Sequence, residues 1–265
     1  MDKSQFYKIL ESQIKVLEDL EELEFQLYRD HDTFNQSKID LVSEAKEKLK
    51  KFADYLNLHS RNKPIEARDY QLNAFIEVMR SRRTLILSPT ASGKSLIIYL
   101  IVRWLQESDH KRGLLIVPTT SLVEQMYSDF ESYGYTKDIH KIYSGVDKES
   151  EEDIVISTWQ SIYKMPKTWF DQFDVVIGDE AHTFKAKSLT SIMTKLTDCE
   201  YRFAFTGTLD GTLTNKLVLE GLFGTVRKVA TSSELMEKKQ LSDLIIKAIV
   251  LQYPEDIKKT FCKVD

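Results

Sequence analysis

The sequence predicts an α/β fold in which a doubly wound parallel sheet follows an N-terminal helical hairpin. Short apolar runs alternate with longer amphipathic stretches between residues 84 and 206. A loop of small residues ending in Gly-Lys-Ser follows the first apolar run, and two carboxylates follow the fourth. Parallel strands bring such segments to one edge of the sheet, where ligands bind in this fold class.

The composition suits a globular protein with no membrane-spanning segment. The chain has 265 residues, 42% hydrophobic and 29% charged, and its apolar runs fall short of the ~20 residues that cross a bilayer. We find no signal-peptide layout, and Cys199 and Cys262 have neither disulfide nor metal-ligand spacing. We therefore expect a reducing, cytoplasmic setting. The net charge of −4 lies within residues 1–60, which hold 13 acidic and 9 basic side chains, so charge does not exclude a nucleic-acid partner.

Residues 1–57 predict an antiparallel helical hairpin. Apolar residues recur every three or four positions over 4–28, and a polar stretch then breaks the pattern. Asn35 or Ser37 can cap a second helix whose apolar face runs from Ile39 to Leu56. Each stripe would pack against the other or against the main domain. We interpret the hairpin as a structural prefix, with docking of a protein partner as the alternative.

A polar linker at 58–66 marks the predicted domain boundary, and a helix opens just after it. Gln71 lies in the first turn of this helix, ahead of the glycine-containing loop. Its amide carries both donors and acceptors, so it can pair with the N6 and N7 edge of adenine. A glutamine on a helix surface is ordinary, and the adenine assignment therefore depends on the loop that follows.

The loop after the first strand has the residue types of a phosphate-binding loop. It runs Ser88-Pro89-Thr90-Ala91-Ser92-Gly93-Lys94-Ser95, with a glycine of the strict pattern replaced by Ser88. Small residues let backbone N–H groups approach phosphates, and Lys94 adds a cation. The Ser95 hydroxyl is placed to bind Mg²⁺. The alternative is a strand-to-helix turn with a solvated lysine.

Paired carboxylates follow the predicted strand at 174–178. Asp179 is placed to hold Mg²⁺, and Glu180 to orient and deprotonate an attacking water. We interpret His182 as a residue that couples sites, because no second His or Cys lies at metal-ligand spacing.

Three further turns follow predicted strands at 113–117, 153–157 and 202–206. They are Pro118-Thr119-Thr120-Ser121, Thr158-Trp159-Gln160 and Thr206-Gly207-Thr208. Hydroxyls and free N–H groups at the first two suit a nucleic-acid phosphate, although ordinary helix capping explains the first equally well. The Trp159 indole can lie against a sugar or base, or pack under the next helix. Thr206 to Thr208 lie close to the acidic pair and can relay the state of the nucleotide to a bound nucleic-acid strand. The alternative is a plain turn.

In this order and spacing, the motifs resemble the first motor domain of superfamily 2 helicases of the DEAH/DExH type. The segment from Arg68 through Tyr70 to Gln71 resembles the adenine-reading Q motif. Motif I is resembled by Pro89–Ser95, motif Ia by Pro118–Gln125, and a later strand-contact motif by Ser157–Ser161. Motif II is resembled by Asp179–His182 and motif III by Thr206–Thr208. The runs LIVPTTSLVEQM and STWQSIYKMPKTWFDQF look most similar to bacteriophage UvsW-type DNA helicases. The resemblance covers roughly 66–254.

The resemblance implies a RecA-like P-loop NTPase domain over 67–240 that uses ATP and Mg²⁺ and binds single-stranded or branched DNA. It implies an ATP-driven helicase or translocase, in the host cytoplasm if phage-encoded. Motifs IV to VI of a second RecA-like domain, with its arginine finger, do not occur in the sequence, and 241–265 would begin the crossing to it. We expect this chain alone to hydrolyse ATP slowly. A nucleotide-gated DNA-binding module, a restriction-enzyme motor and an RNA helicase are the alternatives.

Overall fold

The computed structural model describes residues 34–89, 92–109, 111–184, 186–209 and 213–239. The helix expected at 4–28, loop residues Thr90 and Ala91, and the segment 241–265 lie outside the described residues. The hairpin and the crossing to a second domain therefore stay predictions. None of the helices in the described ranges is long and apolar enough to cross a membrane.

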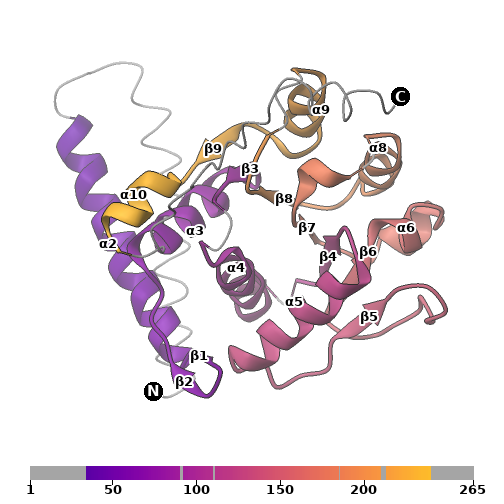
Figure 1. The fold of residues 1–265 in the computed structure, drawn as a ribbon, viewed down its shortest axis with the longest axis horizontal. Helices are drawn as coiled ribbons and strands as arrows, with labels where there is room; N and C mark the ends of the chain where they lie inside the picture. The colour runs from indigo at the N-terminus through magenta and orange to yellow at the C-terminus, as the bar shows by residue number, and fades with distance from the viewer. Residues whose placement is uncertain (1–33, 90–91, 110, 185, 210–212, 240–265) are drawn as a thin grey trace, which may run out of the picture.

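A sheet of seven parallel strands forms the centre of the molecule (Figure 1). Its spatial order is β5-β6-β4-β7-β8-β3-β9. The strands are β3 (Arg83–Leu87), β4 (Gly113–Val117), β5 (His140–Ile142), β6 (Ile154–Thr158), β7 (Val175–Gly178), β8 (Tyr201–Thr206) and β9 (Val226–Lys228). The five main predicted strands are confirmed to within one residue at each end. Since all pairs are parallel, the loops after β3, β4, β6, β7 and β8 emerge at one edge.

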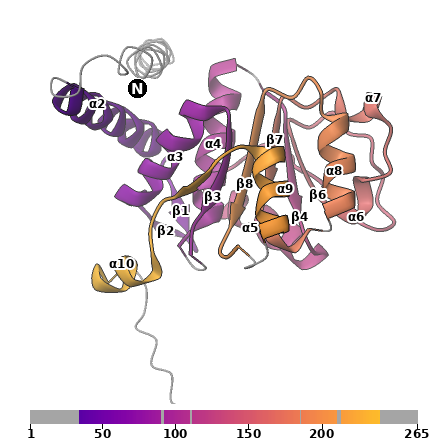
Figure 2. The same cartoon turned by 90° about the horizontal axis from the view of Figure 1, so that it is seen from above.

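Helices cover both faces of the sheet, as a doubly wound fold requires. Side chains alternate along each strand, so Ile86 and Leu85 of β3 enter two different apolar clusters. The first cluster includes residues of α3 (Asp69–Ser81), α4 (Lys94–Asp109) and α5 (Thr120–Ser132). The second includes residues of α6 (Trp159–Ile162), α7 (Lys167–Phe170), α8 (Ala186–Lys195) and α9 (Leu213–Phe223). A short helix, α10 (Ser232–Glu237), follows β9 and extends away from the sheet (Figure 2).

Helix α2 (Phe34–Tyr55) lies outside α3 and closes the first apolar cluster (Figure 2). Leu49 and Phe52 are buried, and the Phe52 ring meets Trp104 of α4 edge-on at 5.1 Å. Residues 45–56 therefore pack against the main domain. The expected start at Asn35 or Ser37 is wrong, because both lie inside the helix. A polar residue near the start of a helix predicts the first helical residue only to within about one turn.

The expected linker at 58–66 contains a small two-stranded ribbon. Strands β1 (His59–Ser60) and β2 (Lys63–Pro64) pair antiparallel across Arg61 and Asn62, whose φ angles are both positive. Positive φ at both central residues is the geometry of a type I′ turn. The Arg61 backbone N–H donates to the Ser132 hydroxyl at 3.1 Å, which ties the ribbon to the end of α5.

Candidate functional site

The loop between β3 and α4 is closed by its own side chains. Ser88 directly follows the strand, and its hydroxyl lies 2.7 Å from the hydroxyl of Ser92. Both side chains are fully buried. Gly93 has a φ of +75°, which turns the chain into α4 at Lys94. The serine that replaces a glycine of the strict pattern thus makes a hydrogen bond across the loop.

Helix α3 holds the same loop from the side. Arg68 precedes this helix, and its backbone N–H donates to Oε1 of Gln71 at 2.9 Å. Nε2 of Gln71 donates to the carbonyls of Ser92 and Gly93 at 3.3 and 3.4 Å, and the Tyr70 hydroxyl also donates to the Ser92 carbonyl. The Gln71 amide therefore has partners on both sides within the chain and positions the loop. Its contact with adenine stays a prediction.

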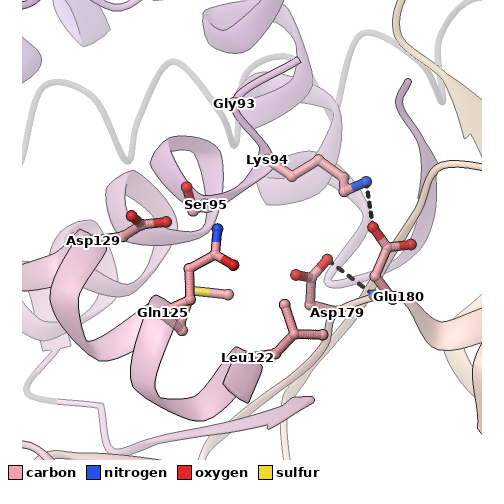
Figure 3. A pocket seen from close by; sticks show the side chains of 9 residues that line it. Gly93, Lys94, Ser95, Leu122, Gln125, Asp129, Asp179 and Glu180 are labelled. Carbon is pink, nitrogen blue, oxygen red and sulfur yellow. Dashed lines mark hydrogen bonds and ion pairs between the residues drawn. The ribbon is translucent and has the colours of Figure 1, made fainter. Parts of the chain in front are cut away.

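The loop lysine and the acidic pair face each other. Nζ of Lys94 lies 2.7 Å from Oε1 of Glu180, and Lys94 is only 8% exposed (Figure 3). The Glu180 backbone N–H donates to Oδ1 of Asp179 at 2.9 Å. Burial raises the pKa of Asp179 to about 6, and the charge of Lys94 opposes this shift. The structure thus brings together the residues placed at the phosphate-binding and acidic motifs.

His182 connects the acidic pair to the turn after β8. Its Nδ1 lies 2.6 Å from Oγ1 of Thr206 and 3.5 Å from Oε2 of Glu180. The Thr206 hydroxyl donates its single proton to the carbonyl of Thr208 at 2.6 Å. Nδ1 of His182 must therefore donate to Thr206, which assigns the tautomer. A continuous path of contacts joins Lys94 to Thr208, and Gly207 lies within the turn.

The phosphate-binding loop and the acidic pair line one side of a cavity of about 300 Å³ (Figure 3). The other side comes from α5, which contributes an acidic, an amide and two apolar side chains. The lining residues are Gly93, Lys94, Ser95, Leu122, Gln125, Met126, Asp129, Asp179 and Glu180.

The motifs do not contain Asp129, and Gln125 is only the last residue of the segment that resembles motif Ia. A signal was present, because Asp129 lies three residues after Met126 on a helix face that otherwise carries apolar residues. A carboxylate in such a stripe needs a partner, and burial raises its pKa.

The side chains of the cavity fit a hard divalent cation. Three carboxylates and the Ser95 hydroxyl face a single ammonium group. Within the described ranges, however, no group of three His, Cys, Asp or Glu side chains could hold a metal ion by itself. This matches Mg²⁺ in nucleotide sites, which takes one or two protein oxygens and completes its shell with phosphates and water.

The two remaining turns lie side by side at the same sheet edge. Nε2 of Gln160 donates to the carbonyl of Pro118 at 3.0 Å and joins the turn after β6 to the turn after β4. Oγ1 of Thr119 accepts from the Leu122 backbone N–H, so the capping role is present in the structure. Thr120 and Ser121 are exposed.

Trp159 and Thr158 are less accessible than their neighbour Gln160. The Trp159 indole is 8% exposed and packs edge-on beside Tyr163, so the packing alternative is the one observed. Oγ1 of Thr158 lies 2.8 Å from the Ser161 hydroxyl. In this conformation, only Gln160 of the three presents an exposed side chain.

Known proteins share both the sequence and the fold. The ATP-dependent DNA helicase uvsW of Enterobacteria phage T4 is 38% identical over 229 residues, which cover 82% of this chain and 46% of the relative. A crystal structure of the UvsW helicase from bacteriophage T4 matches with a TM-score of 0.63 and 35% identity, over 69% of this chain and 67% of that chain. A DNA 3′-5′ translocase, XPB2 of Sulfurisphaera tokodaii, is 29% identical over 144 residues, which are 54% of this chain and 31% of the relative.

A family model described as the res subunit of type III restriction enzymes matches residues 64–211, more than half of the chain. The matched region begins at the β1–β2 ribbon and contains the phosphate-binding loop, the acidic pair and the turn after β8. The chain spans less than half the length of the curated relatives named above. It belongs to the family of this model and, with it, to the superfamily 2 helicases.

Proposed function

We propose that this chain is the first motor domain of an ATP-dependent DNA helicase or translocase that remodels branched DNA. One observation carries the proposal: the phosphate-binding loop and the acidic pair meet across a cavity, with Lys94 and Glu180 in direct contact. A lysine, a hydroxyl and two carboxylates in this arrangement are the protein parts that phosphoryl transfer requires. The 38% identity to the T4 helicase, over most of this chain, supports DNA as the track.

Each residue has a defined task in this proposal. Lys94 would leave Glu180 for the β- and γ-phosphates of ATP, and this exchange would free Glu180 to orient and deprotonate water. Ser95 and Asp179 would hold Mg²⁺, which supplies positive charge at the phosphate oxygens. Tyr70 and Gln71 keep the loop backbone in its phosphate-binding shape.

DNA would cross the sheet edge at the turns after β4 and β6. The exposed hydroxyls of Thr120 and Ser121 and the N-terminus of α5 can contact backbone phosphates. The path through His182 to Thr206 would report the state of Glu180 to this edge.

Full activity requires a second RecA-like domain. Its arginine finger is worth ~10³–10⁵ in rate in phosphoryl-transfer enzymes. We therefore expect these 265 residues to bind ATP and to hydrolyse it slowly.

The test is DNA-stimulated ATP hydrolysis, measured on this chain, on the chain extended by the coding sequence that follows it, and on Glu180→Gln in each. We expect DNA to stimulate the extended chain, and Glu180→Gln to abolish hydrolysis while nucleotide binding remains. A lasting absence of hydrolysis in the extended chain, with ATP-sensitive DNA binding, would replace the motor by a nucleotide-gated binding module.

The family model's description gives a second candidate, the motor of a restriction enzyme. A nuclease or methylase module in the extended chain would favour it. RNA in place of DNA as the better stimulator would instead point to an RNA helicase.

A further inference from the structure

Helix α10 packs beside the tyrosine that holds the phosphate-binding loop. Leu235 of α10, Ala230 and Tyr70 form a small apolar cluster of their own, and Leu235 is only 1% exposed. Tyr70 lies in the first turn of α3, and its hydroxyl donates to the carbonyl of Ser92 in the loop. One end of the tyrosine therefore meets α10, and the other end bonds the loop.

The segment that carries α10 is also attached to the loop through the sheet. Strand β9 pairs in parallel with β3, the strand that leads into the loop. Just beyond β9, the Val229 backbone N–H donates at 3.3 Å to the carbonyl of Leu87, the last residue of β3. Residues 229–235 are thus connected to both ends of the loop, directly at Leu87 and through Tyr70 at Ser92.

The packing of the Tyr70 ring determines where its hydroxyl lies. The hydroxyl gives its proton to the Ser92 carbonyl and accepts from Nη1 of Arg68 at 3.4 Å. Because this oxygen is rigidly fixed to the ring, any freedom of the ring displaces the hydrogen bond. Leu235 supplies part of the packing. Without it, the ring can move and the loop carbonyl loses a fixed donor.

Helix α10 depends on the same contact. It has six residues, too few for a helix that is stable by itself. The Thr231 hydroxyl accepts from the Glu234 backbone N–H at 3.1 Å, and the Thr231 backbone N–H donates to the Glu234 carboxylate at 2.7 Å. This capping box and the buried Leu235 hold the helix in place, so α10 and the Tyr70 ring stabilise each other.

We propose that Leu235 is a positioning residue for the phosphate-binding loop, acting through Tyr70, and that nucleotide binding and the docking of α10 strengthen each other. The inference rests on the proposed function, in which the loop binds the phosphates of ATP. It adds a residue beyond position 211, where the family match ends. Coupling between two sites is reciprocal, so the factor gained in nucleotide affinity is also gained in the docking of α10.

The first test is a double-mutant cycle on the affinity of the 265-residue chain for a fluorescent ADP analogue with Mg²⁺. Tyr70→Phe removes the hydroxyl that bonds the loop and should weaken binding about fivefold, the size of one neutral hydrogen bond. Leu235→Ala should weaken it by about the same factor. Because both changes act on one bond, the double variant should also lose about fivefold, and not the product of about 25-fold.

Three variants control the cycle. Leu235→Met nearly preserves the side-chain volume and should bind within about twofold of the wild type. Leu196→Ala empties an equally buried site, also 1% exposed, before β8 at the opposite edge of the sheet. It should lower stability and change affinity by less than about twofold. Glu237→Ala changes an exposed residue of α10 and should leave affinity unchanged. Melting curves verify that each variant is folded.

The second test is hydrogen exchange of the α10 backbone with and without ADP and Mg²⁺, followed by mass spectrometry. In the wild type we expect the nucleotide to slow exchange over residues 232–239 by about fivefold, because the coupling is reciprocal. In Tyr70→Phe this slowing should disappear. A leucine that only stabilises the fold would give no slowing in either protein.

Wild-type affinity in folded Leu235→Ala would overturn the inference, as would losses that multiply in the double variant or an equal loss in Leu196→Ala. If Leu235→Ala does not fold, Thr231→Ala, which removes the cap of α10, takes its place in the cycle under the same criteria. A wild-type chain that does not bind the nucleotide would refute both the inference and the proposed function. Nucleotide binding that leaves exchange in α10 unchanged would refute the inference alone.

Discussion

At the scale of single residues, the site depends on two backbone positions that few side chains adopt. Glu180 has a φ of +48°, and this conformation directs its carboxylate to Lys94. A non-glycine residue in this region costs on the order of 1 kcal/mol. Gly93 has a φ of +75°, and a Cβ there would lie 2.5 Å from Nε2 of Gln71. Glu180 is therefore held in an unfavourable conformation by its surroundings, and position 93 requires a glycine.

We expect Gly93→Ala to lower nucleotide affinity by at least about tenfold, because the new Cβ forces Gln71 away from the loop carbonyls. Calorimetric titration with ADP measures this loss. Gly145→Ala is the control, since Gly145 shares a positive φ, +87°, and a Cβ there meets nothing within 4 Å. Equal affinities in the two variants would contradict the close approach.

Asp179→Asn should stabilise the nucleotide-free chain, and the gain should depend on pH. The folded-state pKa of about 6 lies above the usual value of 3.8 for an aspartate, so the folded chain holds this proton more tightly than the unfolded chain does. The ionised carboxylate therefore costs stability once pH rises through the folded pKa. The neutral amide avoids this cost.

We expect the difference in unfolding free energy between Asp179→Asn and the wild type to be largest above about pH 6 and to shrink toward pH 4. Chemical denaturation at a series of pH values measures it. A difference that stays constant across this pH range would mean that burial does not raise the pKa of Asp179.

At the scale of elements, α2 belongs to the core of the sheet domain. Its side chains at 45, 49, 52 and 53 are buried in the same cluster as those of α3 and α4. The apolar periodicity of 39–56 predicted this helix and its face. It could not predict which surface the face would cover, because an amphipathic stripe specifies burial and no particular partner.

Phe52→Ala should destabilise the chain by about 3–5 kcal/mol, since it empties a site beside Trp104 in the core. Urea denaturation measures the loss, and Lys51→Ala, at the neighbouring exposed position, should change stability by less than about 0.5 kcal/mol. A similarly small effect of Phe52→Ala would mean that α2 is a separable appendage, in agreement with a domain boundary at 58–66.

The strands also differ in how far the sequence predicts them. Strands β4 and β6 are buried along their whole lengths, and their continuous apolar runs marked them clearly. The edge strand β9, Val226–Lys228, has two exposed charged residues and shows no alternation. This strand is defined by its pairing with β3, and a sequence of three residues is too short to show a pattern that predicts such a tertiary contact. The β1–β2 ribbon was missed because Arg61-Asn62 is a weak turn signal compared with Asn-Gly.

At the scale of the whole molecule, the parallel sheet brings segments that are distant in the sequence to one edge, where they form the site. Lys94, Glu180 and Thr206 are far apart in the chain, yet each lies at or just beyond the end of a strand at the same sheet edge. This rule of topology explains why most of the candidate site could be predicted from its motifs. Asp129 lies in the body of α5 and Tyr133 caps its C-terminus, where no such rule applies. They reach the site because α5 packs against α4, and only the packed structure reveals that contact.

The most direct measurement is a crystal structure of this chain with Mg²⁺ and a non-hydrolysable ATP analogue. We predict that the analogue binds in the cavity between the phosphate-binding loop and α5, with Lys94 moved from Glu180 to the phosphates. We also predict that Ser95 and Asp179 lie at the metal and that Glu180 is free to face the terminal phosphate. An analogue bound elsewhere, or an intact contact between Lys94 and Glu180 in the bound state, would contradict the central claim that this cavity is the nucleotide site of a motor.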